Sequence, residues 1–140
     1  MKDISFIYDK KQRCFDLNML GSEIQFEETL QTGVSLSLFT DAKVDEFEIP
    51  DGKENRGFWA DVLDGENTGS KLWLILRSKN KIDVPKSAEE YCKKALFWLI
   101  EDKLVDNIDC TAKIEKNNLI INIIIHHNNI TSHFKYEVKP

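Results

Sequence analysis

Polar and apolar residues alternate through the C-terminal third of the chain, and this alternation constrains the fold more than any other feature. Two asparagine pairs, Asn117-Asn118 and Asn128-Asn129, have the composition of two-residue hairpin turns. Three antiparallel strands then lie near Val105–Glu115, Leu119–His127 and Ile130–Val138. One face of this sheet is apolar, with Ile108, Cys110, Ala112, Ile114, Leu119, Ile121, Ile123, Ile125, Ile130, Phe134 and Tyr136. A slip of one residue would turn polar side chains into the core, so we predict a meander with well-defined faces.

The opposite face of this sheet is polar and is interrupted only by Ile120 and Ile124. It carries Asp109, Thr111, Lys113, Glu115, Asn122, His126, Thr131, His133, Lys135 and Glu137. His126 and His133 become diagonal neighbours there, close enough to share an ion. A durable zinc site needs three or four ligands, and this face adds only oxygen atoms of Thr131, Glu137 and Asp109. We therefore predict a solvated histidine pair, with no metal and no cofactor.

A helix before the sheet is the natural cover for its apolar face. The segment Ser87-Ala88-Glu89-Glu90 has the spacing of a capping box, which predicts a helix from Ser87 to about Asp102. Apolar residues line one stripe of this helix, but Phe97, Trp98 and Ile100 extend the hydrophobicity around its second half. We therefore predict that Trp98 and Leu99 are buried.

The N-terminal half gives weaker patterns. Ile4–Tyr8 and Cys14–Leu17, on either side of the polar Asp9–Arg13, predict a short hairpin. Between Glu27 and Phe39 the apolar residues fit a strand by alternation and a helix by their spacing of four, so the pattern leaves both open. The apolar run after Ser70 is likewise either a buried strand or a helix with Ser70 as its N-cap. The predicted fold class is α+β, with a helical layer packed on a C-terminal three-stranded antiparallel meander and an N-terminal β-hairpin.

Length and composition suit one domain covering residues 1–140, because 41% of the 140 residues are hydrophobic. The chain has 19 Lys and Arg against 24 Asp and Glu and no basic run, which argues against nucleic acid as a partner.

Its longest apolar runs are too short for a membrane span, and it opens without a signal-peptide core, so we expect no membrane partner. Cys14, Cys92 and Cys110 are widely spaced, which predicts reduced, packed thiols.

A long loop about 40–69 stands out, because it holds four of the six glycines and has no sustained period. At its centre, the adjacent aromatic residues Phe58 and Trp59 lie among polar residues. Such residues either fold back on their own core or form a binding surface. We select Arg56, Phe58, Trp59 and Asp61 as candidate partner contacts.

Signatures of catalysis are missing from the sequence. It contains no Walker loop, GxGxxG, HExxH, GxSxG or nucleophilic Cys-His pattern. The acidic residues between Asp41 and Asp64 could supply the carboxylate pair of a glycosidase, but nothing in the sequence raises the pKa of one of them by burial. We therefore predict that the chain is not an enzyme.

Four motifs follow one another along the chain. They are Ser37-Leu38-Phe39-Thr40-Asp41, Arg56-Gly57-Phe58-Trp59-Ala60-Asp61, Gly69-Ser70-Lys71-Leu72-Trp73-Leu74 and Ala95-Leu96-Phe97-Trp98-Leu99-Ile100-Glu101-Asp102. In their order and rough spacing they resemble the motifs of the Mu-like bacteriophage baseplate family. The family pattern is closer to Arg-Gly-Trp-Trp-Gly-Asp and Gly-Ser-Arg-Leu-Trp-Leu, so Phe58, Ala60 and Lys71 are departures. The departure at Ala60 matters if glycine is needed there. The resemblance implies an α+β fold, helices over Glu27–Phe39 and Ser70–Arg77, and no catalytic residues to carry over.

The resemblance also implies a function. Proteins of this kind are similar to the small wedge or sheath-initiator proteins of contractile phages, which were once called lysozyme-like. The implied role is a structural component of a contractile phage or prophage tail baseplate, which joins wedge components and helps to initiate sheath assembly. Its partners would be other baseplate wedge, tube and sheath proteins, and several copies would be present in each baseplate. The implied locations are the host cytoplasm during assembly and then the virion tail baseplate.

The C-terminal strand, Ile130–Val138, is an additional candidate contact. It is a sheet edge unless the N-terminal hairpin pairs with it, and an edge can accept a strand from another chain. Lys135 on this strand is therefore the fifth candidate partner contact. Two other functions remain open: a cell-wall hydrolase of glycosidase (lysozyme-like) type and a host-side protein-binding regulator.

Overall fold

The computed structural model describes residues 2–9, 11–12, 14–24, 26–76 and 83–139. It contains two compact units, Met1–Leu36 and Ser37–Pro140. Helices and antiparallel strands are both present, which confirms the predicted α+β class. No helix within the described ranges is both long and apolar enough to span a bilayer.

The first unit consists of short antiparallel strand pairs. These are β1 (Lys2–Ile4) with β6 (Phe26–Glu28), β2 (Phe6–Asp9) with β3 (Cys14–Leu17), and β4 (Met19–Leu20) with β5 (Glu23–Ile24). The pair β2 and β3 confirms the predicted hairpin, but its first strand is Phe6–Asp9 and not Ile4–Tyr8, because Ile4 lies in β1 and pairs with Phe26. In its turn, the Asp9 carboxylate accepts hydrogen bonds from the backbone amides of Lys11 and Gln12, at 2.7 and 3.2 Å. Lys10 and Arg13 of the predicted turn lie outside the described residues.

Helix α1 (Thr29–Phe39) resolves the ambiguity left by the sequence, although it begins two residues later than the resemblance implied, because Glu27 and Glu28 belong to β6. Val34 and Leu38 are buried, whereas Leu36 between them is 49% exposed. This is the spacing of four expected of a helix and not the alternation of a strand. The second ambiguous segment is also helical, since α3 covers Leu72–Ile75. The N-cap of α3 is Lys71, but the Ser70 hydroxyl accepts a hydrogen bond from the Leu72 amide at 3.3 Å. Arg77 lies outside the described residues.

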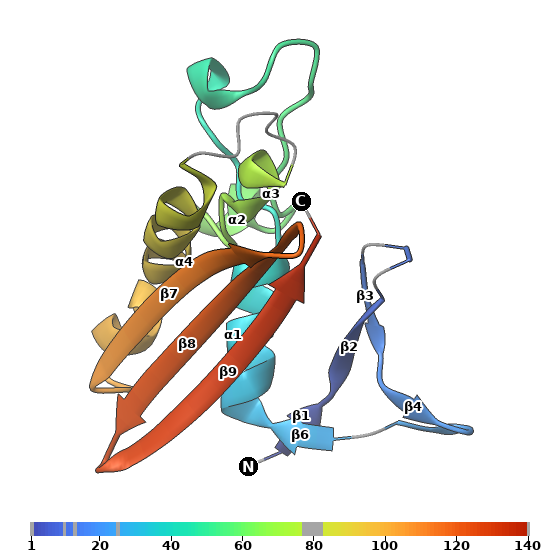
Figure 1. Ribbon diagram of the computed structural model, residues 1–140, viewed down its shortest axis with the longest axis vertical. Coiled ribbons are helices and arrows are strands. Elements are labelled where there is room, and N and C mark those ends of the chain that lie inside the picture. Colours follow the sequence, from blue (N-terminus) through green and yellow to red (C-terminus); the bar gives the residue numbers. More distant parts are fainter. Residues whose placement is uncertain (1, 10, 13, 25, 77–82, 140) are drawn as a thin grey trace. The chain divides into compact units, whose positions relative to one another are not determined.

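The C-terminal sheet has the order β7-β8-β9 and is antiparallel throughout, as predicted. Its strands are β7 (Asn107–Glu115), β8 (Asn118–His127) and β9 (Ile130–Val138). Figure 1 shows them side by side. The second turn is Asn128-Asn129, as predicted, and both residues have positive φ, as a type I′ turn requires.

The first turn of the sheet differs from the prediction by one residue. It consists of Lys116 and Asn117, with φ of 47° and 67°, and Glu115 pairs with Asn118. Asn117-Asn118 was therefore the wrong choice, because Lys116 adopts the left-handed conformation in place of Asn118. Moving the turn by one residue shifts the strand pairing by two, so every side chain keeps its predicted face. Leu119, Ile121, Ile123 and Ile125 are each at most 1% exposed, which confirms the apolar face.

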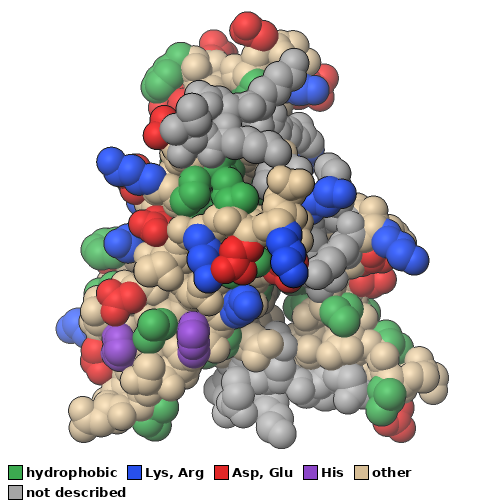
Figure 2. Space-filling model, viewed as in Figure 1, with side chains coloured by type: hydrophobic (Ala, Val, Ile, Leu, Met, Phe, Trp, Pro, Cys, Tyr) green, Lys and Arg blue, Asp and Glu red, His purple; other side chains and the backbone are tan. Residues whose placement is uncertain are grey.

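The opposite face of the sheet is polar, as Figure 2 illustrates with its histidine, lysine and acidic side chains. His126 Nε2 lies 3.3 Å from Asp109 Oδ2, and its Nδ1 lies 3.3 Å from Thr131 Oγ1. Ile120 is an exception to this polarity, since it is only 4% exposed. It occupies the central strand and pairs with Lys113 on β7 and Glu137 on β9, whose long side chains flank it.

Helix α4 (Val84–Glu101) contacts β7 and β8. Ala88, Cys92, Leu96 and Leu99 are its buried face, each at most 2% exposed. The predicted start at Ser87 was wrong, because the helix begins one turn earlier and the Ser87 amide donates to Asp83 O at 3.0 Å. Pro85 explains the difference. It lies in the first turn, where no amide donor is needed and the fixed φ of proline favours a helix.

The prediction that Trp98 is buried was also wrong, whereas Leu99 is buried as expected. Trp98 is 39% exposed and its Nε1 donates to Ser37 Oγ at 3.0 Å, while the neighbouring Phe97 is 51% exposed. A helix of this length can be apolar on several sides without being covered on all of them. Hydrophobicity alone did not distinguish the covered side from the exposed one.

The two outer strands of the sheet differ in what lies beside them. The two residues that flank a two-residue turn form two backbone hydrogen bonds with each other, and after them hydrogen-bonded and non-hydrogen-bonded pairs alternate along the two strands. By this alternation the Ala112 amide of β7 points away from β8, and it donates to Glu89 Oε1 of α4 at 2.9 Å. By the same alternation the Lys135 amide of β9 points away from β8. At Ala112 the outer side of β7 is thus bonded by α4, whereas among the described residues β9 pairs with β8 alone.

The cysteines are all free thiols, but they are not all packed. Cys92 and Cys110 are buried. Burial raises the pKa of the Cys110 thiol to about 11, and it raises the pKa of the more deeply buried Cys92 thiol by a larger amount. Such thiols stay protonated and unreactive at neutral pH. Cys14 is exposed, which corrects the expectation that it is packed: β3 presents it at the end of a short two-stranded hairpin.

Candidate functional site

The candidate site is the loop of residues 40–69, which is closed at its base by backbone bonds. The Ser70 amide donates to Thr40 O at 2.9 Å, and the Ala42 amide donates to Ser70 O at 3.0 Å. Gly69, directly before Ser70, has a φ of +102°, a conformation that other residues rarely adopt. A Cβ atom at Gly69 would lie 2.2 Å from Thr40 O. The chain can therefore close the loop only because residue 69 is a glycine.

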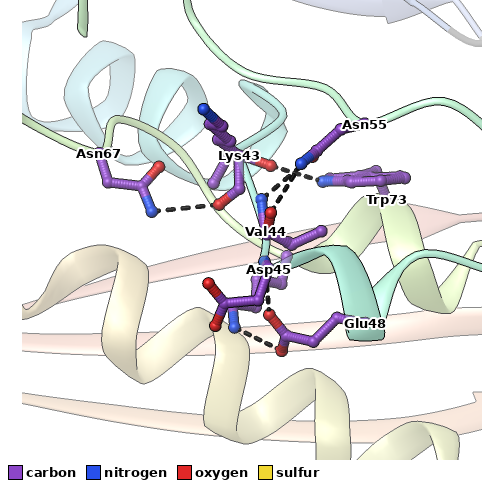
Figure 3. Close-up of polar contacts among 9 residues, drawn as sticks. Lys43, Val44, Asp45, Glu48, Asn55, Asn67 and Trp73 are labelled. Carbon is purple, nitrogen blue, oxygen red and sulfur yellow. Dashed lines mark hydrogen bonds and ion pairs between the residues drawn. The ribbon is translucent and has the colours of Figure 1, made fainter. Parts of the chain in front are cut away.

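Three side chains bind the backbone of the segment 42–44 (Figure 3). Trp73, which is 3% exposed, donates its indole hydrogen to Ala42 O at 2.9 Å. Asn55 bonds both backbone groups of Val44: it accepts from the amide at 3.1 Å and donates to the carbonyl at 2.6 Å. From the other side, Asn67 donates to Lys43 O at 3.1 Å. The loop is thus ordered by hydrogen bonds between residues distant in sequence.

Glu48 fixes the turn that follows this segment. It ends the short 3₁₀ helix Glu46–Glu48 and accepts a hydrogen bond from the Asp45 amide at 3.1 Å. Its other oxygen lies 2.6 Å from Lys71 Nζ. The hydrogen bond from Lys71, with the bond from Asp45 added, holds the pKa of Glu48 below its ordinary value of 4.5. A general acid needs the opposite shift, so Glu48 is suited to structure and not to proton donation.

Two of the candidate contact residues are engaged within the loop. Arg56 forms an ion pair with Asp41, and its guanidinium carbon lies 5.6 Å from the centre of the Trp73 ring. Asp61 accepts two hydrogen bonds from Thr68, from the amide at 2.9 Å and from the hydroxyl at 2.6 Å. Both side chains therefore hold the loop in shape.

The other two candidates of the loop face solvent. Trp59 is 76% exposed and Phe58 39%, with their ring centres 5.7 Å apart. Trp59 therefore does not fold back on the core. The next residue, Ala60, has φ of −73° and ψ of −18°, so the glycine of the family pattern is not required for this conformation. Helix α2 (Asp61–Asp64) follows directly and exposes Val62 and Leu63.

A cleft of about 390 Å³ lies within the loop. Phe58 and Val62 line it together with acidic and basic residues, which are Asp45, Glu48, Asp61, Glu66, Lys43 and Lys71. The structure thus brings Arg56, Phe58, Trp59 and Asp61 into one loop, whereas Lys135 lies on β9, outside this segment. Sequence reasoning missed Asn55, Glu48 and Lys71, because no motif shows which side chains of a loop bond one another or the backbone.

Replacing Glu48 by glutamine tests the role of this carboxylate. Its lowered pKa means that its contribution to stability is present above pH 4.5 and is lost as the pH falls through the lower value of the folded state. We expect E48Q to lower the free energy of unfolding by about 1 kcal/mol at pH 7, because the ion pair is partly exposed. Urea unfolding at pH 7 and pH 3 measures this. An equal loss at both pH values would contradict the assignment.

Comparisons with known proteins add to this geometry. The family described as "Phage protein GP46" matches residues 30–132. The chain is 35% identical over 115 residues to "Baseplate protein gp46" of Escherichia phage Mu, covering 81% of the chain and 78% of that protein. It is 30% identical over 105 residues to "Mu-like prophage FluMu protein gp46" of Haemophilus influenzae, covering 74% and 72%.

Proposed function

The chain belongs to the GP46 family of phage proteins, and from this we propose that it is a structural component of a phage or prophage tail baseplate. The observation that carries the proposal is the 35% identity, over 81% of the chain, to a protein named as a baseplate component of phage Mu. A structural role requires surfaces that bind neighbouring proteins, and no catalytic centre. The loop and the outer strand β9 are such surfaces.

The more detailed proposal is that the chain joins wedge components of a contractile tail and helps to initiate the sheath. Its partners would be wedge, tube and sheath proteins, and each baseplate would contain several copies of the chain. Assembly would take place in the host cytoplasm. Residues 1–140 would act as one domain. Support comes from the sheet: the outward Ala112 amide of β7 is bonded by Glu89 of α4, while the Lys135 amide of β9 points away from β8. An outer strand with available backbone groups can extend its sheet with a strand from another chain.

Deleting the gene from the parent phage or prophage tests the baseplate role. We expect tails to be absent or to lack a complete baseplate in electron micrographs, and the wild-type gene in trans to restore them. The restored tails should contain the chain, detected by mass spectrometry of purified particles. Normal tails without the chain would refute the proposal. Turnover of peptidoglycan by the purified chain, abolished by substitution of one carboxylate, would favour the hydrolase alternative.

Substituting Lys135 by proline tests the outer strand. Proline removes the outward amide and leaves the bonds to β8 intact, so K135P should remain folded by circular dichroism. We expect baseplates with K135P to fail to nucleate sheath polymerisation in vitro. K135A is the matched control, because it removes the same side chain and keeps the amide. Normal sheath growth on K135P baseplates would refute the role of β9, and unfolding would show that its outer side is needed within the chain.

Substituting Trp59 by alanine tests the loop as a contact. Trp59 is 76% exposed, so W59A should leave the stability of the isolated chain within about 0.5 kcal/mol. Incorporation into tails should fall about tenfold, since buried tryptophans often dominate interface energies. Arg56 and Asp61 serve the same contact by holding the loop in shape. W59A tails with a normal amount of the chain would contradict this assignment.

A further inference from the structure

The net charge of the chain is concentrated in the loop of residues 40–69. This segment holds nine of the 24 Asp and Glu and only three of the 19 Lys and Arg. The remaining residues therefore carry 15 acidic and 16 basic side chains and are nearly neutral. A partner drawn to this loop by electrostatics must be positively charged, and polyanions such as nucleic acid are repelled.

The same loop exposes an unusual amount of apolar surface. Trp59, Val62 and Leu63 are 76%, 87% and 77% exposed, and Phe58 lies against Trp59. We call these four side chains the apolar ledge. These four large apolar residues lie within six consecutive positions, and all of them are exposed. Exposed apolar patches of this kind on soluble proteins mark interaction sites. The ledge gives the partner an apolar contact in addition to the charge.

The charged groups beside the ledge differ in what they already bind. Lys71 is paired with Glu48, and Arg56 with Asp41, so these cations and carboxylates satisfy one another. Among the described residues, no ion pair is found for Asp64, next to Leu63, or for Glu66, on the cleft wall. These two carboxylates flank the ledge and can accept a cation from outside.

We propose that the apolar ledge and its flanking carboxylates bind a cationic surface of a neighbouring protein in the assembly. That surface presents Lys or Arg beside an aliphatic or aromatic side chain: the apolar side chain covers Trp59, Val62 and Leu63, and the cation meets Asp64 and Glu66. Burying the ledge around these charge pairs would remove them from solvent and strengthen them. This inference rests on the proposed baseplate function and adds the chemistry of the partner.

Charge reversal tests the proposal in the whole assembly. The double variant Asp64→Lys with Glu66→Lys is expressed in trans in the gene-deleted parent, and the chain is quantified in purified tails by mass spectrometry. We expect incorporation to fall about tenfold, because attraction is replaced by like-charge repulsion. The matched control is Glu101→Lys with Asp102→Lys, which changes the net charge equally at exposed positions outside the loop. The control should assemble within about twofold of wild type.

Crosslinking of wild-type tails provides a second test that needs no variant. A water-soluble carbodiimide joins a carboxylate to a lysine amine only when the two are in contact. We expect a crosslink from Asp64 or Glu66 to a lysine of another protein, and its yield should fall as salt screens the attraction during assembly. Crosslinks from other carboxylates only would overturn the proposal, as would equal incorporation of the reversed variant and its control. If wild-type tails lack the chain, the proposed function itself fails, whereas normal incorporation of the reversed variant refutes only this inference.

Discussion

Replacing Leu96 by alanine is expected to lower the free energy of unfolding by about 3 to 5 kcal/mol, measured by urea denaturation. Leu96 is 0% exposed and lies at the centre of the buried face of α4, which contacts β7 and β8. The truncation removes apolar contacts and leaves a cavity, since a helix and a sheet joined by many other side chains cannot collapse around the gap. The loss is therefore larger than the transfer free energy of the deleted atoms alone.

The adjacent residue supplies the control for this experiment. Phe97 is larger than Leu96 but 51% exposed, so Phe97→Ala should cost less than about 1 kcal/mol. The comparison separates burial from residue type within the same turn of the same helix. Equal losses for the two variants would mean that the exposed side of α4 is covered, and the burial pattern described above would be wrong.

Replacing Gly69 by alanine is expected to lower the free energy of unfolding by about 3 kcal/mol. Two effects combine: φ is +102°, and the added Cβ would lie 2.2 Å from the backbone oxygen of Thr40. Relieving this overlap requires Thr40 and Ser70 to separate, and this would break the hydrogen bonds of Ser70 with Thr40 and Ala42 that close the base of the loop. The expected loss is thus one of backbone geometry, in a position where no side chain is removed.

Gly65 provides the matched position for this second substitution. It also has a positive φ, of +70°, but a Cβ there would meet no atom within 4 Å. Gly65→Ala should therefore cost only the conformational term, about 1 kcal/mol. Thermal or urea unfolding of both variants distinguishes the two contributions. A loss at Gly69 no larger than that at Gly65 would show that the base of the loop adapts easily.

The faces of the sheet could be predicted from the sequence, whereas the exact turn could not. Side-chain direction depends only on whether a residue is odd or even in its strand, and this survives a turn displaced by one residue. Lys116 and Asn118 are both polar neighbours of Asn117, so composition did not decide between them. The predicted start of α4 was wrong for a similar reason. The residues from Ser87 to Glu90 have the composition of a capping box, but Pro85 also favours a helix start, and the helix begins at Val84.

The arrangement of the loop could not be predicted from the sequence. Its shape depends on pairs such as Arg56 with Asp41 and Asp61 with Thr68, and on Asn55 bonding the backbone of Val44. A motif shows which residue types occur together, but not which of them turn inward. Of the four candidate residues in the motif, the polar Arg56 and Asp61 form bonds within the loop, whereas the aromatic Phe58 and Trp59 are exposed. The charged residues of the motif, which would ordinarily be expected to face solvent, therefore stabilise the loop.

The contact between Glu89 and the Ala112 amide limits how copies of this chain can associate. A sheet with two usable sides can add copies without end and become a filament. Here Glu89 of α4 already bonds the outward amide of Ala112, whereas β9 pairs with no described strand other than β8. Two copies that pair through their β9 strands would join the two sheets into one, and both outer strands of that joined sheet would be β7. The Glu89 carboxylate, by occupying an amide on the outer side of β7, therefore disfavours the addition of further copies to this sheet.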